Sequence, residues 1–364
     1  MNINKFGIYA VFSAIALIAL FRNPSVIGAA DTPSLIDSRN LQNTVFTPLL
    51  QSEIEPGKNL VYCASFQAAW NEFIDTVIHE PVLVEGDSLP VRMLNKKFGG
   101  NNVIPEELFI AAAGFEEAGI IERIRVMFKD KFRLEAPPGN LNPGAPGDIL
   151  VYAYLRREFS FKIEFENLPG LVLFNNDSPV RAFGIQRFTF DEPHQGLAAQ
   201  VEIFDFKNDN DFIIRLKSLS LEDELILAKI KPLPTLLETV NQAFLRISAN
   251  PYPTGLFEGE TVRIPKFDFD ISSYFAEFMG RSLLNREFYG RPLNRMIQVV
   301  RFKLNEKGAL FSAETVRGED QPLTLETVPR KLIFNSPFLV LIKKKKCQQP
   351  YFAMWIENTE LMLK

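Results

Sequence analysis

The residue types that most often carry catalysis are scarce in this chain and form no recognisable motif. Its two histidines, His79 and His194, have no second metal ligand at the helical spacing that zinc sites use. The sequence contains no nucleophile elbow, no phosphate-binding loop and no dinucleotide fingerprint. We therefore expect a protein that is not an enzyme and that uses no metal ion and no cofactor.

Paired carboxylates could supply acid–base chemistry if they converged on one site. Glu106 and Glu107 lie at the start of a predicted helix, and Asp268 and Asp270 alternate with apolar residues along a predicted strand. Such alternation is typical of a strand with one face in solvent. The pattern therefore predicts solvated carboxylates.

The basic residues could bind a polyanion, but a net charge of −4 argues against a general nucleic-acid binder. Basic residues between Arg123 and Arg133 are interleaved with acidic ones, which favours a solvated helix face. The run Lys343–Lys346 lies between two predicted strands and is typical of a charged turn that discourages edge pairing. Polyanion or membrane-surface binding is the weaker alternative.

The N-terminal residues have the pattern of a secretory signal peptide. Lys5 precedes an apolar run from Phe6 to Phe21, and Gly28-Ala29-Ala30 supplies small residues for cleavage before Asp31. The alternative, a transmembrane anchor, needs about 18–20 apolar residues, more than this run provides. We expect residues 1–30 to be removed and residues 31–364 to be secreted to the extracellular space, with no membrane span.

An oxidising compartment permits a disulfide between Cys63 and Cys347, but two separate thiols fit the sequence equally well, because spacing does not show proximity. Asn176-Asp177-Ser178 is a glycosylation sequon in a turn-like stretch. Pro179 directly follows the sequon and lowers the expected extent of glycosylation at Asn176.

Apolar residues recur at helical spacing mainly in the first half of the chain and alternate as in strands mainly in the second half. Helices are predicted at 41–55, 64–78, 105–113, 116–132, 235–248 and 272–284. Strands are predicted at 59–63, 149–165, 170–174, 180–190, 198–206, 211–216 and 261–271. With 33 Phe residues and no internal repeat, this order predicts one α+β domain with mixed β-sheets and a Phe-rich core.

The last sixth of the chain, from Val299 to Asn358, organises the rest. It reads as a strand up to about Gly308, a long segment without clear structure up to about Lys331, and then two strands joined by a charged turn. Loops longer than about 12–15 residues are uncommon in compact domains and are usually functional. We therefore expect the specific function to lie in the loop of about residues 308–331.

Several segments resemble the serpin family and occur in the family's order. Leu304-Asn305-Glu306-Lys307-Gly308 is similar to the strand end and hinge that open a serpin reactive-centre loop. The other similar segments are 59–62, 149–165, 262–267, 334–342 and 351–358. The resemblance implies a single serpin-like domain, shortened between about residues 79 and 147, with Gln298 where the family often has a histidine beneath the main sheet.

The resemblance implies inhibition of an extracellular serine protease. In inhibitory serpins the protease cleaves the exposed loop, which then inserts as a new strand into the main sheet and traps the enzyme. Small residues suit an inserting hinge. The corresponding residues here are Glu306, Lys307, Gly308, Ala309, Phe311, Ser312, Ala313, Glu314 and Thr315.

Two of these hinge residues oppose insertion, because alternate residues of an inserted strand face opposite sides of the sheet. If Phe311 faces the core it overpacks, at a cost of about 1–3 kcal/mol. If Glu314 faces the core, an unpaired charge is buried. Either register slows insertion and lets the protease escape.

The scissile bond is less defined than the hinge. Family spacing from Glu306 puts it near Pro322-Leu323, whereas Arg317 and Arg330 would suit a trypsin-like enzyme, and Leu323 and Leu325 a chymotrypsin-like one. The alternative function is a non-inhibitory serpin-fold protein that binds, carries or stores another molecule.

Overall fold

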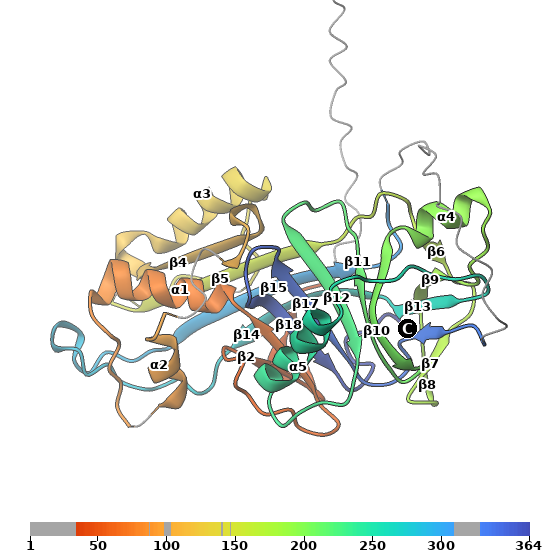
Figure 1. The fold of residues 1–364 in the computed structure, drawn as a ribbon. Coiled ribbons are helices and arrows are strands. Elements are labelled where there is room, and N and C mark those ends of the chain that lie inside the picture. The colour runs from red at the N-terminus through yellow and green to blue at the C-terminus, as the bar shows by residue number, and fades with distance from the viewer. Residues whose placement is uncertain (1–33, 87, 98–102, 140, 146, 309–327) are drawn as a thin grey trace, which may run out of the picture. The chain divides into compact units, whose positions relative to one another are not determined.

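The computed structural model describes residues 34–86, 88–97, 103–139, 141–145, 147–308 and 328–364. Residues 34–364 form one compact unit built mainly from a five-stranded and a seven-stranded sheet. The strand orders are β1-β14-β15-β5-β4, β10-β11-β12-β17-β18-β3-β2 and, in a third sheet, β16-β13-β9-β6. The predicted α+β class with mixed sheets is confirmed (Figure 1).

The strands and helices have the following bounds. The five-stranded sheet contains β1 (Ile36–Asp37), β4 (Phe109–Phe115), β5 (Ile149–Glu158), β14 (Phe267–Tyr274) and β15 (Arg295–Leu304). The seven-stranded sheet contains β2 (Thr44–Thr47), β3 (Asn59–Cys63), β10 (Val201–Asn208), β11 (Asp211–Leu216), β12 (Asp223–Lys229), β17 (Phe338–Lys344) and β18 (Pro350–Ile356). The remaining strands are β6 (Glu166–Asn167), β7 (Val172–Phe174), β8 (Ser178–Val180), β9 (Ala182–Ile185), β13 (Thr261–Pro265) and β16 (Lys331–Ile333). The helices are α1 (Ser65–Phe73), α2 (Leu89–Leu94), α3 (Ile120–Phe132), α4 (Glu192–Ala198) and α5 (Leu236–Ala249).

Helices cover the two faces of the five-stranded sheet where β4 and β5 lie. On one face, Phe66 and Trp70 of α1 pack in a core cluster with Val151 and Ala153 of β5. On the other face, Phe128 of α3 packs against Tyr152 and Tyr154, with ring centroids 6.0 and 4.8 Å apart. Figure 1 shows α1 and α3 on opposite sides of these strands. Alternate residues of β5 therefore face different surroundings, as the pleat of a strand requires.

The five-stranded and seven-stranded sheets share an apolar core. Phe302 of β15 stacks on Phe352 of β18, with ring centroids 5.0 Å apart and an interplanar angle of 9°. Phe267 of β14 packs on Phe338 of β17 in the same cluster. The Phe-rich core that composition predicted therefore joins the two sheets.

Three predicted helices are wrong, and in each case pairing with a neighbouring strand decides the conformation. Residues 41–55 contain β2, which runs parallel to β3. Residues 105–113 form a single 3₁₀ turn followed by β4, whose small residues pair with β5 between the two covering helices. Residues 272–274 continue β14 and pair with β15. Strand β12, which the sequence did not reveal, lies in the middle of the seven-stranded sheet.

A buried charge cluster also links the two sheets. Arg157 of β5 lies 2.9 Å from Asp223 of β12, and the Tyr351 hydroxyl donates a 2.9 Å hydrogen bond to the same carboxylate. The Arg157 side chain is 8% exposed and that of Asp223 is 1% exposed. Burial raises the pKa of Asp223, although Arg157 opposes the rise. Removing one partner of such a pair leaves the other charge buried and unpaired.

We expect Asp223→Asn to lower the free energy of unfolding by about 3–5 kcal/mol, because it leaves the Arg157 guanidinium buried without a counter-charge. Tyr351→Phe removes one hydrogen bond to the charged carboxylate and should cost about 1.5–3 kcal/mol. Urea denaturation measures both. Equal small decreases in the free energy of unfolding for the two variants would show that the Arg157–Asp223 ion pair contributes little to stability.

Candidate functional site

The pairing of β5 with β15 is the feature of the main sheet on which the candidate site depends. These two strands are parallel, from Arg295 opposite Leu150 to Lys303 opposite Glu158. The pairs on either side, β4 with β5 and β14 with β15, are antiparallel. Strand β15 leads directly into the segment predicted to be the loop. We call the β5–β15 boundary the seam.

The first residues after β15 are held by an ion pair. Glu306 Oε2 lies 2.5 Å from Lys266 Nζ, and the two side chains are 10% and 7% exposed. Lys266 Nζ also donates a 2.9 Å hydrogen bond to Asn167 Oδ1. Burial would raise the pKa of Glu306, but the hydrogen bond and charge of Lys266 outweigh it and hold that pKa below its ordinary value. The carboxylate is therefore ionised and anchors the hinge.

Gly308 lies against the chain that continues from β5. A Cβ atom at this position would lie 2.3 Å from the backbone nitrogen of Glu164 and 2.8 Å from the carbonyl carbon of Ile163. Phe161 and Phe165 donate backbone hydrogen bonds to the carbonyls of Lys307 and Glu306, 3.1 and 2.9 Å long. Glycine is therefore required by this close approach of two backbones.

The far end of the predicted loop is held at Arg330. Its guanidinium forms two bonds with the Glu260 carboxylate, at 2.5 and 2.9 Å, and a further bond of 3.0 Å with the Gly255 carbonyl. The Arg330 side chain is 17% exposed, and β16 follows it directly in parallel pairing with β13. A trypsin-like protease would have to break these contacts to bind the Arg330 side chain, so they make Arg330 an anchor of the chain that enters β16.

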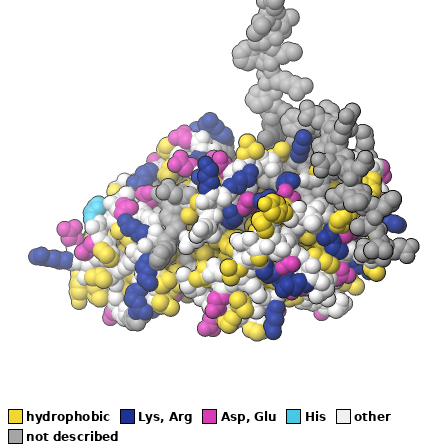
Figure 2. All heavy atoms as spheres, in the orientation of Figure 1, with side chains coloured by type: hydrophobic (Ala, Val, Ile, Leu, Met, Phe, Trp, Pro, Cys, Tyr) yellow, Lys and Arg dark blue, Asp and Glu magenta, His cyan; other side chains and the backbone are white. Residues whose placement is uncertain are grey.

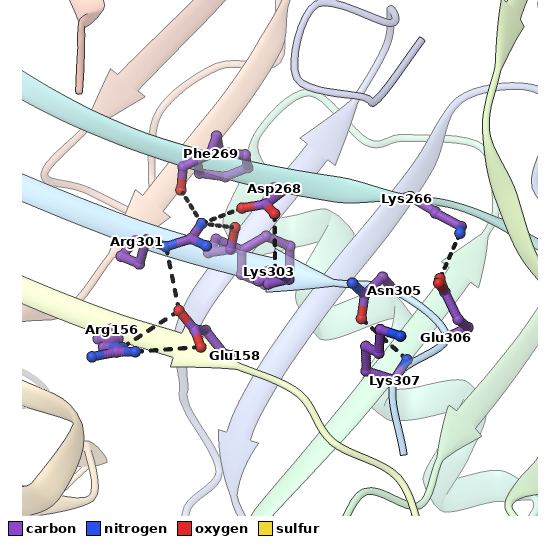
Figure 3. Close-up of polar contacts among 11 residues, drawn as sticks. Arg156, Glu158, Lys266, Asp268, Phe269, Arg301, Lys303, Asn305, Glu306 and Lys307 are labelled. Carbon is purple, nitrogen blue, oxygen red and sulfur yellow. Dashed lines mark hydrogen bonds and ion pairs between the residues drawn. The ribbon is translucent and has the colours of Figure 1, made fainter. Parts of the chain in front are cut away.

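A charged network covers the outer face of the sheet beside the hinge (Figure 3). Arg301 of β15 lies 2.5 Å from Asp268 of β14 and 3.3 Å from Glu158 of β5. Lys303 lies 3.2 Å from Asp268, and Arg156 lies 3.4 Å from Glu158. Arg301 is 5% exposed and Asp268 is 17% exposed.

The predicted solvated face of β14 is therefore wrong. Asp268 is held by Arg301, and Oδ1 of Asp270 is buried and accepts no hydrogen bond from the described residues. Burial raises the pKa of Asp270 to about 6, against the opposing charges of Arg301 and Arg156. The missed signal was the matching alternation of Arg301 and Lys303 in the partner strand, because charges directly opposite in antiparallel strands form pairs.

Beneath the seam lies Gln298, which is fully buried. Its Nε2 donates to the Cys63 carbonyl at 3.0 Å and to Ser65 Oγ at 2.9 Å. These bonds connect β15 with the start of α1. The predicted position of Gln298 beneath the sheet is thus confirmed.

The other predicted site residues divide into two groups. Glu306, Lys307, Gly308 and Arg330 are described and lie on either side of residues 309–327. Outside the described residues lie Ala309, Phe311, Ser312, Ala313, Glu314, Thr315, Arg317, Pro322, Leu323 and Leu325.

The sequon and the cysteines lie away from the hinge. Asn176 is exposed at the turn between β7 and β8, with φ 66°. Cys63 is buried, with Sγ 3.1 Å from Ser65 Oγ, and is not bonded to Cys347.

The described residues offer little for a metal ion or a membrane. Within the part of the chain that the structure describes, no group of three or more His, Cys, Asp and Glu residues could hold a metal ion. In the same ranges, no helix is long and apolar enough to cross a bilayer. On the face seen in Figure 2, basic and acidic side chains are mixed. Lys343 and Lys344 belong to β17, where Lys343 forms a 2.7 Å ion pair with Glu224 of the neighbouring strand β12, whereas Lys345 and Lys346 are exposed in the turn that follows.

Comparison with known proteins gives structural neighbours only. No family model and no curated protein matches the sequence. Similar solved structures include SRPN18 from Anopheles gambiae, with a TM-score of 0.41, 12% identity, and coverage of 65% of this chain and 64% of that one. They also include native protease nexin-1 with heparin, with a TM-score of 0.44 and 13% identity. That match covers 76% of this chain and 74% of the other. A third is the structure of a tumour suppressing serpin, with a TM-score of 0.46 and 11% identity. That match covers 82% of this chain and 92% of the other.

These structural neighbours are serpins. This chain spans about 64% of the length of SRPN18. Because the identities are low and the TM-scores lie below 0.5, the proposals below depend on the chain's own strand order and contacts.

We expect Glu306→Gln to lower the free energy of unfolding by about 1.5–3 kcal/mol, because it removes a charged hydrogen-bond partner from buried Lys266. Limited proteolysis near residue 306 should also accelerate. The matched control is Lys307→Gln, whose partner Glu164 is 3.5 Å away and exposed, so both readouts should stay near wild type. Equal effects of the two variants would contradict the anchoring role of Glu306.

Asp270 should make the stability depend on pH. Its folded-state pKa of about 6 lies above the ordinary value of 3.8, so folding favours the protonated form and the benefit is lost as pH rises from about 4 to 6. Asp270→Asn should therefore stabilise the protein by roughly 1–3 kcal/mol at pH 7.5. Near pH 4 the variant should be no more stable than wild type, because Asp270 is then protonated in the folded protein. Urea denaturation at both pH values is the measurement, and a gain independent of pH would exclude titration of Asp270 as its cause.

Proposed function

We propose that this chain is a secreted inhibitor of an extracellular serine protease, with a serpin-type mechanism of loop cleavage and insertion. The observation that supports it best is the parallel seam between β5 and β15, directly beside the strand that leads into the loop. A strand that turns back from β15 runs antiparallel to it. Such a strand is also antiparallel to β5 only because β5 and β15 are parallel to each other.

Insertion of a strand at the seam would produce a more stable sheet. One parallel boundary would be lost and two antiparallel boundaries gained, and antiparallel pairing is slightly more stable per residue. The two strands would have to separate by about one further strand spacing of roughly 4.8 Å. The inserted form should therefore be lower in free energy, provided that the hinge residues can be packed.

The two anchors explain why cleavage would be needed. The loop leaves the sheet at Glu306, held by Lys266, and returns at Arg330, held by Glu260. While the chain is continuous, the second anchor holds the end of the segment in the third sheet. A cut between the anchors frees the part attached to β15 to move, while β16 stays in place.

The protease class depends on residues 309–327. Arg317 would suit a trypsin-like enzyme, and Leu323 or Leu325 a chymotrypsin-like one, with Pro322-Leu323 at the family spacing. Arg330 is the least accessible candidate, because its side chain is bound to Glu260. Phe311 and Glu314 would slow insertion for the reasons of packing and charge given above.

Secretion is part of the proposal. A signal peptide at residues 1–30 would direct the chain to the extracellular space, where its target protease would be found. Exposed Asn176 would there accept a glycan. Polyanion binding at Lys343–Lys346 is a weaker proposal, since Lys343 is held by Glu224.

Incubation of residues 31–364 with trypsin and with chymotrypsin tests the mechanism. We expect an SDS-stable covalent complex with one of them and a higher Tm of the cleaved chain, because the loop has joined the sheet. The control is protease inactivated at its nucleophilic serine, which should form no such complex. Clean cleavage within 309–327 with an unchanged Tm would contradict inhibition by insertion.

The alternative is a non-inhibitory binding or carrier protein, and one pocket favours it. A cavity of about 770 Å³ lies between α5, β10–β12 and the turn after β17. Its lining combines apolar Phe204, Ile226 and Phe244 with basic Lys345 and Lys346. Its volume is within the range of about 300–1,000 Å³ typical of small-molecule sites. Under this alternative the chain is cut without insertion, and an anionic apolar ligand raises the Tm of the intact protein.

A further inference from the structure

An ion pair crosses the seam at the end where an inserting strand would have to enter. Arg301 belongs to β15 and Glu158 is the last residue of β5, and Arg301 Nε lies 3.3 Å from Glu158 Oε1. The regular ladder between β5 and β15 ends at Glu158, opposite Lys303. Beyond it, toward the hinge, the backbone amides of Phe159 and Phe161 donate hydrogen bonds to the carbonyls of Lys303 and Lys307. Figure 3 shows this pair on the left and the Glu306–Lys266 anchor on the right of the same view.

The two partners are fixed to different sides of the seam. Arg301 is held on the β14 side by Asp268 at 2.5 Å, and it donates a 3.1 Å hydrogen bond to the Phe269 carbonyl. Glu158 has a second partner on its own strand, Arg156 at 3.4 Å. When the strands separate, neither side chain can follow the other without leaving these partners.

We propose that the Arg301–Glu158 ion pair is a latch that controls how readily β5 and β15 separate. Its functional consequence, slower entry of the loop strand, rests on the proposed function above. The effect of the ion pair on strand separation does not depend on that proposed function. Separation by roughly 4.8 Å breaks the pair completely, because the contact is already 3.3 Å long in the closed sheet.

The pair's surroundings make the latch releasable. Both partners keep another counter-charge after opening, so no buried charge is left alone. Glu158 is 34% exposed, so water and salt reach its carboxylate. The pair therefore adds a modest barrier that salt can screen.

Native-state hydrogen exchange tests the latch without any protease. In Glu158→Gln, amides in peptides covering residues 149–158 and 295–304 should exchange roughly two- to fivefold faster than in wild type, the range expected for a partly exposed ion pair. The substitution preserves the shape of the side chain and leaves Arg301 with Asp268. In 1 M salt the difference between wild type and variant should shrink, because the Debye length falls to about 3 Å.

The matched control is Arg156→Gln. Arg156 also contacts Glu158, but from the same strand, and it lies opposite Arg301 in the β5–β15 register. Like charges opposite each other destabilise a strand pair, so this variant should exchange at the wild-type rate or more slowly.

The results separate the latch from the proposed function. Unchanged exchange at the seam in Glu158→Gln, or equal acceleration in Arg156→Gln, would overturn the latch. Faster exchange in Glu158→Gln alone supports it, even if protease cleavage then raises no Tm. An unchanged Tm after cleavage would count against loop insertion and not against the latch.

Discussion

The parallel pairing of β5 with β15 is the constraint on which the rest of this structure depends. The two strand pairs that flank it, β4 with β5 and β14 with β15, are antiparallel. Parallel pairing is slightly the weaker arrangement, and parallel strands need a long connection between them. Here that connection contains strands β10, β11 and β12 of the seven-stranded sheet and strands β6, β9 and β13 of the third sheet.

The surroundings of the seam are more polar than those of an ordinary sheet core. Beneath it, Gln298 is fully buried and its Oε1 accepts no hydrogen bond from the described residues. Further along β5, Arg157 and Asp223 form a buried pair between the sheets. Buried polar groups without full hydrogen bonding reduce stability. These polar groups therefore make the interior around the seam less stabilising than a fully apolar one.

Ion pairs hold the chain just before and just after residues 309–327. Lys266 connects β13 with β14 and binds Glu306, whereas Glu260 precedes β13 and binds Arg330. One short stretch of chain, from Glu260 to Lys266, therefore holds both ends. The hinge is further restricted by Gly308, where two backbones approach too closely for a side chain. The chain on both sides of residues 309–327 is thus held by a few buried contacts around β13.

The sequence by itself determined the elements whose evidence is local. Capping by Thr235 and Glu238 starts α5, and apolar periodicity places α1 and α3 correctly. The order of the C-terminal segments predicted a hinge from Glu306 to Gly308, whose first residues the structure describes, but it gave Arg330 as a candidate cleavage site and not as the anchored residue that the structure shows. Only the tertiary structure decided the strand character of 109–115 and 272–274, because pairing with β5 and β15 outweighs their local helical pattern. Likewise, only the sheet register brought Arg301 to Glu158, 143 positions apart, and buried Asp268 and Asp270 that alternation alone assigned to solvent. Charge pairing across strands depends on which strands are neighbours, and a single sequence does not contain that information.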